Sequence, residues 1–524
     1  MNERRDFLKF MGKTTAVAAL SPLIMTEKLH SAEFTEYKAI VYVLLQGGND
    51  AFNMVIPTAF TADPNDAEAV ESEAISDGNG YYNYKKVRRT LAIKNVDLSS
   101  ELITDTEGNL DTTTSNPYSG ATIDEKYLSG SYHINKLDED GVPTNEPMGI
   151  GINAVMPEVA HLINTNKLAV IGNVSALVEP TTKQQIEESS VRLPVHLFAH
   201  NHQQRVHATG IADNNKTSGW AGRLFKELGP INGLNPIGNN TSFSGYAHVL
   251  TGNTTSALSL SLNPRGYKAR YRVTDLHTAL SETASTNPFE RLYGTFIQRA
   301  YGLSATLGDV FSNPRAYNTL DSYGGSLFSL PSGDNGNVGF DYSDSIISKF
   351  EAIAKVIDYN TNNNTEVKRQ IFYIDMGGFD THGSQVNDHP YLLRGLSIAL
   401  GKFQLAMEEL GLSNQVTTMT VSDFGRSSGS NGDGTDHAWA GHNLIMGGAV
   451  KSGFYGDIPD FTLGGVQDFS SRGRIIPTVA VDQQYSTVLK WYGVDNTTLD
   501  TIFPNLANFD NTRYGRDMGF MKSV

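Results

Sequence analysis

Short, uninterrupted apolar runs alternate with helix-periodic segments along most of this chain. The first run, from Ala39 to Leu45, is stopped by two glycines. Such a run is typical of a strand that is buried on both faces of a sheet. Further strands are expected at 168–172, 370–374 and 416–421, and helices at 156–164, 346–357, 391–410 and 484–492. This alternation predicts an α/β fold built on a doubly wound, mostly parallel sheet.

Carboxylates, histidines and glycines gather directly after these strands. Ligands of open α/β sheets bind beyond the carboxyl ends of the strands, so this edge is the candidate site. Neutral imidazole and carboxylate groups are the ligands that Zn²⁺, Mn²⁺ and harder divalent ions accept. The side chains at these ends are Asp50, Asn53, Asp380, His382, Asp423, Arg426, Asp436, His437 and His442.

The same residue types also have an ordinary structural explanation. Asp, Asn and Gly after a strand serve as turn and helix-cap residues, so a single Asp-His pair is compatible with a plain turn. Clusters at several successive strand ends, in one chain, favour the metal site.

The composition excludes several kinds of site and argues against one class of partner. The chain has 524 residues, a formal net charge of −15 and no cysteine. The lack of cysteine excludes disulfides, thiolate zinc sites, iron–sulfur clusters and a cysteine nucleophile. The acidic balance argues against a nucleic-acid partner, because a phosphate backbone is held by surfaces dense in Lys and Arg.

Residues 1–32 have the layout of a secretory signal peptide. Basic residues precede a weakly apolar run, and small residues end it at Ser31-Ala32. The run is shorter than the ~20 apolar residues of a membrane-spanning helix, and Arg4-Arg5 resembles a twin-arginine export signal. We expect the twin-arginine translocation machinery to export the chain, leaving a periplasmic or extracellular protein without a transmembrane segment. The alternative is an amphipathic N-terminal helix of the mature fold.

Six segments, in this order, resemble one bacterial family. They are VYVLLQGGNDAFNMVIP (41–57), LPVHLFAHNHQQ (193–204), GWAGRL (219–224), GGFDTHGSQ (377–385), SDFGR (422–426) and GTDHAWAGHNLIMGGAV (434–450). Together with the leader they resemble the exported family known as domain of unknown function 1501, within the alkaline-phosphatase/sulfatase-like superfamily. The resemblance implies an alkaline-phosphatase-like domain over 38–510. Within it, the polar composition of 61–147 predicts an insertion or lid, and a loosely held C-terminal tail is expected at 511–524.

The resemblance also implies one or two divalent ions, of Zn, Mn, Ca or Mg, held between Asp and His residues. On that pattern Asp50 resembles the metal-binding Asp of the first strand, and His442 resembles a late single His. Asp380 with His382, and Asp436 with His437, resemble the pairs at the two ion positions. Asp423 is an alternative to the Asp436-His437 pair, since relatives often carry Asp-His where this chain has Asp423-Phe424.

The nucleophile is where the chain departs from this pattern. The family commonly has Ser or Thr directly before His200, but this chain has Ala199. His200 and His202 are expected to be further ligands, acid/base groups or a hydrogen-bonded loop pair. We group His200 with Asn53 and Arg426 as candidate catalytic side chains. Arg426 would offer a bidentate fork to an anionic ester or form an ion pair with a neighbouring carboxylate.

Two functions remain open from the sequence. The first is an exported metal-dependent hydrolase of phosphate or sulfate esters, acting on a small-molecule or polymer substrate. There, two ions about 4 Å apart would clamp the attacking and leaving oxygens. The alternative is a non-catalytic envelope or secreted protein that keeps the fold, which Ala199 and the large polar insertions favour.

Overall fold

A computed structural model of the chain separates Met1–Thr35 from a second unit, Glu36–Val524. The structure describes residues 34–523, except 59–79, 112–113, 120–121, 215–217, 230, 233–236, 254–256, 263–286, 313–314, 320–325, 330–340 and 364. The expected signal peptide at 1–32 lies outside the described residues. So does the first part of the insertion expected at 61–147.

A nine-stranded mixed sheet forms the centre of the second unit. Its strands, in spatial order, are β15 (Gly453–Gly456), β7 (Leu168–Ser175), β14 (Gly441–Met446), β11 (Val416–Ser422), β1 (Lys38–Leu45), β10 (Arg369–Met376), β8 (Asn240–Ser242) and β9 (Leu258–Ser259), with β16 (Val479–Ala480) beside β7. Among the described strands of this sheet, only β14 runs antiparallel to its neighbours. The expected mostly parallel α/β sheet is therefore confirmed, and all four expected strands are present.

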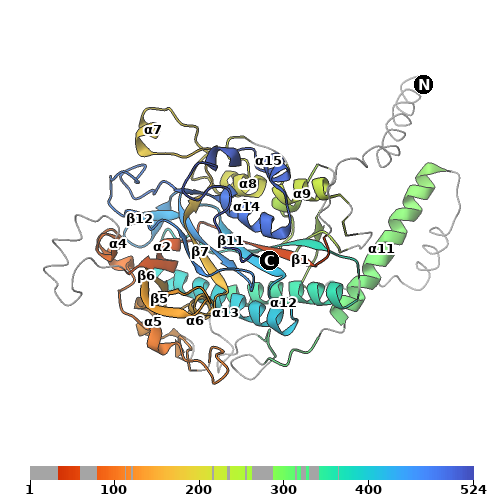
Figure 1. Ribbon diagram of the computed structural model, residues 1–524, viewed down its shortest axis with the longest axis horizontal. Coiled ribbons are helices and arrows are strands. Elements are labelled where there is room, and N and C mark those ends of the chain that lie inside the picture. The colour runs from red at the N-terminus through yellow and green to blue at the C-terminus, as the bar shows by residue number, and fades with distance from the viewer. Residues whose placement is uncertain are drawn as a thin grey trace. The chain divides into compact units, whose positions relative to one another are not determined.

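Helices cover both faces of this sheet (Figure 1). One layer holds α6 (Pro157–Asn164), α12 (Asp341–Asn362) and α13 (Gln385–Glu409), and the other holds α8 (His200–Thr209), α9 (Trp220–Leu228), α14 (Val481–Tyr492) and α15 (Asn496–Ile502). The long helix α11 (Pro288–Ser312) precedes α12 along the chain. All four expected helices are found within one to six residues of the predicted starts.

Alternate residues of β1 pack into different layers. Ala39, Val41 and Val43 are fully buried and belong to the main hydrophobic core, which includes residues of α6, α12 and α13. Tyr42 faces the other layer, where its ring lies 6.4 Å from Trp220 of α9 and 6.3 Å from Tyr485 of α14. This two-sided burial explains why the strand is apolar throughout.

The described part of the insertion is more regular than its polar composition suggests. It contributes α4 (Tyr81–Arg88), α5 (Glu125–Ser129), the short pair β3 (Tyr118–Ser119) and β4 (Thr122–Ile123), the strand β5 (Ser131–Leu137) and the first part of β6 (Pro143–Asn153). The strand β6 pairs with β2 (Val55–Pro57) and with β5. Tyr81, Tyr84 and Val87 of α4 are buried in a cluster with Phe52, so α4 is fixed to the segment that follows β1.

The tail expected at 511–524 makes specific contacts in its described residues, up to 523. Phe520 is fully buried, its carbonyl accepts from the Lys451 amide at 2.8 Å, and the Lys522 amide donates to Ala449 at 2.8 Å. These bonds bridge Met521 to Val450, so the end of the chain is anchored beside the sheet.

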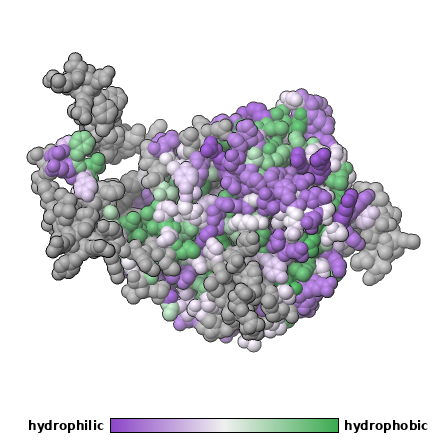
Figure 2. All heavy atoms as spheres, turned by 180° about the vertical axis from the view of Figure 1, so that it is seen from behind, coloured by the Kyte–Doolittle hydropathy of each residue, from purple (hydrophilic) through white to green (hydrophobic). Residues whose placement is uncertain are grey.

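The surface on the far side of the view in Figure 1 mixes hydrophilic and hydrophobic side chains (Figure 2). Among the described helices, none combines the length and the apolar character that crossing a membrane requires.

Candidate functional site

The register of three central strands brings the candidate residues together. Leu45 at the end of β1 is level with Met376 of β10 and Ser422 of β11. Because these strands are parallel, their following loops leave the sheet at the same edge. Gly47 lets two of these loops meet, since it has φ +112° and a Cβ there would lie 2.4 Å from the Asp380 amide nitrogen.

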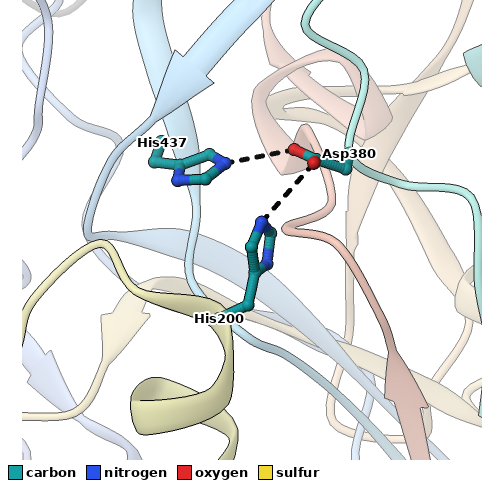
Figure 3. A group of neighbouring side chains, drawn as sticks. All are labelled: His200, Asp380 and His437. Carbon is teal, nitrogen blue, oxygen red and sulfur yellow. Dashed lines mark hydrogen bonds and ion pairs between the residues drawn. The ribbon is translucent and has the colours of Figure 1, made fainter.

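Three side chains from distant segments converge beyond this edge (Figure 3). They are His200 at the start of α8, Asp380 after β10, and His437 at the end of β13 (Thr435–His437). His437 Nε2 lies 3.1 Å from Asp380 Oδ1, and His200 Nε2 lies 3.5 Å from Asp380 Oδ2. One ligand atom of each residue lies within 4.8 Å of those of the other two, which is compatible with a shared cation. We call these three residues the His–Asp–His group.

The second ring nitrogen of each histidine in the group is held by a hydrogen bond. His437 Nδ1 lies 2.9 Å from the Phe198 carbonyl oxygen and must donate to it, since a carbonyl cannot donate. His200 Nδ1 lies 2.8 Å from Asp423 Oδ2. Both rings therefore turn Nε2 toward Asp380. This arrangement, in which an outer acceptor fixes the tautomer, is the usual support of a metal-binding histidine.

Backbone strain accompanies this support. Phe198 has φ +71° and His196 has φ +51°, values that side-chain-bearing residues rarely adopt. The strained turn ends at Ala199, directly before α8, and it directs the Phe198 carbonyl at His437. Strain of this kind persists where the surrounding structure imposes it and is frequent at functional sites.

Asp423 is fully buried, in contrast to Asp380. Burial raises the pKa of its carboxyl, although hydrogen bonds from His200, Gly47 and Gln204 act in the opposite direction. All three bonds reach Oδ2, at 2.8, 3.1 and 3.1 Å. Asp423 thus contacts His200 at Nδ1, away from Asp380, and is not itself a member of the His–Asp–His group.

Phe424, the residue after Asp423, lies against both histidines. Its ring centroid is 4.8 Å from that of His200 and 4.6 Å from that of His437. Where the family resemblance leads one to expect a second histidine, this chain therefore has an apolar ring that limits how the two imidazoles can move.

His382 and Asp436 lie at the outer rim of the group. His382 Nε2 is 2.8 Å from His437 Nε2, and its Nδ1 is 3.4 Å from Asp436 Oδ1. His382 Nε2 also lies 3.2 Å from Asp380 Oδ1, so this third histidine borders the group directly. The side chains of His382 and Asp380 are 46% and 47% exposed, so solvent reaches the group from this side.

Arg426 forms an ion pair with Asp380. Its side chain is fully buried, and Nη2 donates to Asp380 Oδ1 at 2.9 Å. Burial by itself raises the pKa of Asp380, but the charge of Arg426 and the contact with His437 outweigh it and lower the pKa. Arg426 is level with His437 in the hairpin of β12 (Arg426–Ser430) and β13. Of the two expected arrangements of Arg426, the structure contains the ion pair.

Burial also lowers the pKa of the His437 imidazole, against the opposing influence of Phe198 and Asp380. A neutral imidazole is the form that can bind a metal ion. His200 Nε2 is a buried atom without a hydrogen-bond partner among the described residues. Two imidazole nitrogens and a carboxylate oxygen that face one another, one of them unpartnered, fit a divalent transition-metal ion.

The three candidates not yet placed are Asp50, Asn53 and His442, and none of them belongs to the His–Asp–His group. Asp50 is fully buried and forms an ion pair with Arg88, and Asn53 donates to the Leu91 carbonyl and accepts from Tyr84. His442 is buried, and burial lowers its pKa to about 3.

Sequence reasoning missed Arg88 and Phe198. Arg88 falls in the polar insertion, and the sequence does not distinguish it from its basic neighbours Lys85, Lys86 and Arg89. Its position four residues after Tyr84 and seven after Tyr81 gives only a weak sign of a buried helix face. Phe198 acts through its backbone carbonyl, which side-chain identity does not reveal.

Comparison with known proteins gives limited similarity. Residues 362–499 match the family described as "Protein of unknown function (DUF1501)", a segment that contains Asp380 and His437 but not His200. No curated protein matches the chain. A solved structure described as "Crystal structure of Ps i-CgsB in complex with k-i-k-neocarrahexaose" is similar with a TM-score of 0.29 and 11% identity, over 66% of this chain and 68% of that chain. "Crystal structure of Ps i-CgsB" gives a TM-score of 0.28 and 12% identity, over 67% and 71%.

Proposed function

We propose that this chain is an exported hydrolase of phosphate or sulfate esters that depends on a divalent metal ion. The observation that carries the proposal is the convergence of His200 Nε2, His437 Nε2 and the Asp380 carboxylate, with the far side of each ring held by an outer acceptor. The ester substrate follows from the resemblance of the motifs to the alkaline-phosphatase/sulfatase-like superfamily. Export follows from the twin-arginine-like leader.

In this proposal His200, Asp380 and His437 hold the ion. When bound, it polarises an ester oxygen and offsets the negative charge that develops in the transition state. Asp423 and the Phe198 carbonyl keep the two rings in place, and Arg426 keeps Asp380 ionised and oriented. Preorganisation of this kind avoids reorientation of the site during the reaction.

Water is the attacking group in this proposal, because Ala199 supplies no hydroxyl. Within the described residues, no serine or threonine hydroxyl forms a hydrogen bond with the side chains of the His–Asp–His group. The water oxygen bonds to phosphorus or sulfur and releases a proton to the solvent, the bond to the leaving oxygen breaks, and that oxygen takes up a proton. We assign the supply of this proton to His382, which lies at the exposed rim beside His437.

The test combines metal content with turnover. Protein purified after native export, without chelators, is analysed by plasma mass spectrometry and then assayed with the bound ion on aryl phosphate, phosphodiester and aryl sulfate probes. We expect bound metal and activity in the unaltered protein, and loss of both in His437→Ala, with circular dichroism unchanged. The matched control is His161→Ala, a partly buried histidine of α6, which should retain metal and activity.

Either of two results would reject the proposed enzymatic function. Metal-loaded protein that turns over none of the probes favours the non-catalytic alternative, for which Ala199 is the supporting observation. Turnover that persists unchanged in a folded His437→Ala variant would place the chemistry elsewhere in the chain.

A further inference from the structure

Asp50 already has a cation of its own. Both of its oxygens accept from the Arg88 guanidinium, Oδ2 from Nη1 at 2.6 Å and Oδ1 from Nη2 at 2.7 Å. Gln385 donates a further hydrogen bond to Oδ2. The two charged side chains are both 0% exposed. A carboxylate offers about four lone-pair positions, and these contacts use three of them.

Arg88 is held in this position by its surroundings. The guanidinium carbon lies 5.6 Å from the ring centre of Phe52 and 6.0 Å from that of Tyr84, which is cation–π range. Phe52 comes from α2 (Ala51–Met54), directly after Asp50, and Tyr84 comes from α4, one turn before Arg88. The described part of the insertion therefore delivers a fixed positive charge to the carboxylate at the end of β1.

His442 also has a hydrogen-bond partner within the chain. Its Nδ1 accepts from the Asn173 amide at 3.0 Å, so in the neutral ring the other nitrogen carries the proton. A protonated nitrogen cannot bind a metal ion. His442 Nδ1 and the Asp50 carboxylate, which the family resemblance assigns to metal, thus each have a partner from the chain itself.

We propose that the Arg88 guanidinium takes the place of a second divalent ion at Asp50, so that the chain binds one ion, at the His–Asp–His group. Repulsion between like charges would oppose a divalent ion beside Arg88. The one-ion part of this inference rests on the proposed function, whereas the pairing of Asp50 with Arg88 does not. The two can therefore be tested apart.

The first experiment measures metal content in the exported protein and in Asp50→Asn, with Glu158→Gln as a matched control. Glu158 also lies in a buried bidentate pair, with Arg394, on α6 and α13. We expect one equivalent in the unaltered protein and in both variants, and none in His437→Ala. Two equivalents in the unaltered protein, with one lost in Asp50→Asn but retained in Glu158→Gln, would overturn the inference while leaving the hydrolase intact.

The second experiment measures thermal midpoints in excess EDTA for Asp50→Asn, Arg88→Met and the double variant. With one charge removed the other is left buried and unpaired, so each single variant should melt lower than the double variant. Effects of the two substitutions that simply add would show that the residues are not partners and would overturn the inference. This result does not depend on metal, so protein found to be free of metal would reject the proposed function and still leave the Asp50–Arg88 pairing decided.

Discussion

Asp482 gives a pH dependence of stability whose sign and size follow from its environment. It lies in the first turn of α14 and is 3% exposed. Its Oδ2 has no hydrogen-bond partner among the described residues. Burial raises the pKa of this carboxyl from 3.8 to about 8, although the charge of Arg223 acts to lower it. The folded protein therefore holds a proton that the unfolded chain releases near its ordinary pKa.

The direction follows from proton linkage. A group whose pKa is higher in the folded state contributes stability that is complete below the unfolded pKa. That contribution is lost as pH rises through the folded pKa, here over the interval from about 4 to about 8. At roughly 1.4 kcal/mol per pKa unit, the loss is on the order of 5 kcal/mol. Asp482→Asn keeps the shape and removes the titration, so the variant should not lose this contribution.

The assay is thermal unfolding of both proteins from pH 5 to pH 9. We expect the midpoint of Asp482→Asn to rise relative to the unaltered protein as pH increases, with most of the change complete by about pH 8. Asp388→Asn is the control, since Asp388 occupies the first turn of α13 but is exposed. If the difference between Asp482→Asn and the unaltered protein stays constant over this range, Asp482 is ionised in the folded state and the reasoning fails.

Three further predictions concern the site and the core. Asp423→Asn should weaken metal binding by ~10–100-fold through the loss of the charged partner of His200; unchanged affinity in a chelator competition would contradict this. Gly425→Ala should lower the urea midpoint of unfolding, because its Cβ would lie 1.7 Å from the Ala440 carbonyl oxygen, and a midpoint equal to that of the unaltered protein would refute the clash. Arg394→Met should lower the free energy of unfolding by about 3–5 kcal/mol, since it leaves the buried carboxylate of Glu158 without its cation. A decrease below about 1 kcal/mol in urea unfolding would show that this carboxylate becomes neutral at little cost.

The fold was predictable because its signals are local. A strand buried on both faces is apolar throughout, so β1, β7, β10 and β11 stand out as short apolar runs. The C-terminal tail gave no such signal. It is held by backbone bonds to Ala449 and Lys451 and by the single buried ring of Phe520, and no period in the sequence indicates contacts of this kind.

The site was predictable only in part. Parallel strands end at one edge, so the approach of Asp380 to the loop after β11 follows from the topology. The partner of Asp50 does not, because Arg88 lies 38 residues further along, in a stretch of polar composition. Residue type identifies which side chains can bind a metal ion, whereas the charges around each one decide which are free to do so.

The site also sets the order in which the protein can mature. Its hydrogen bonds join residues 223 positions apart between His200 and Asp423, and 239 apart between Phe198 and His437. The chain must therefore emerge from the ribosome beyond residue 437 and close these long loops before a complete binding site exists. Under the proposed metal dependence, the ion would be captured only late in folding. With the proposed export, the compartment in which the chain completes its fold, rather than the one in which it acts, would then determine which metals it first encounters.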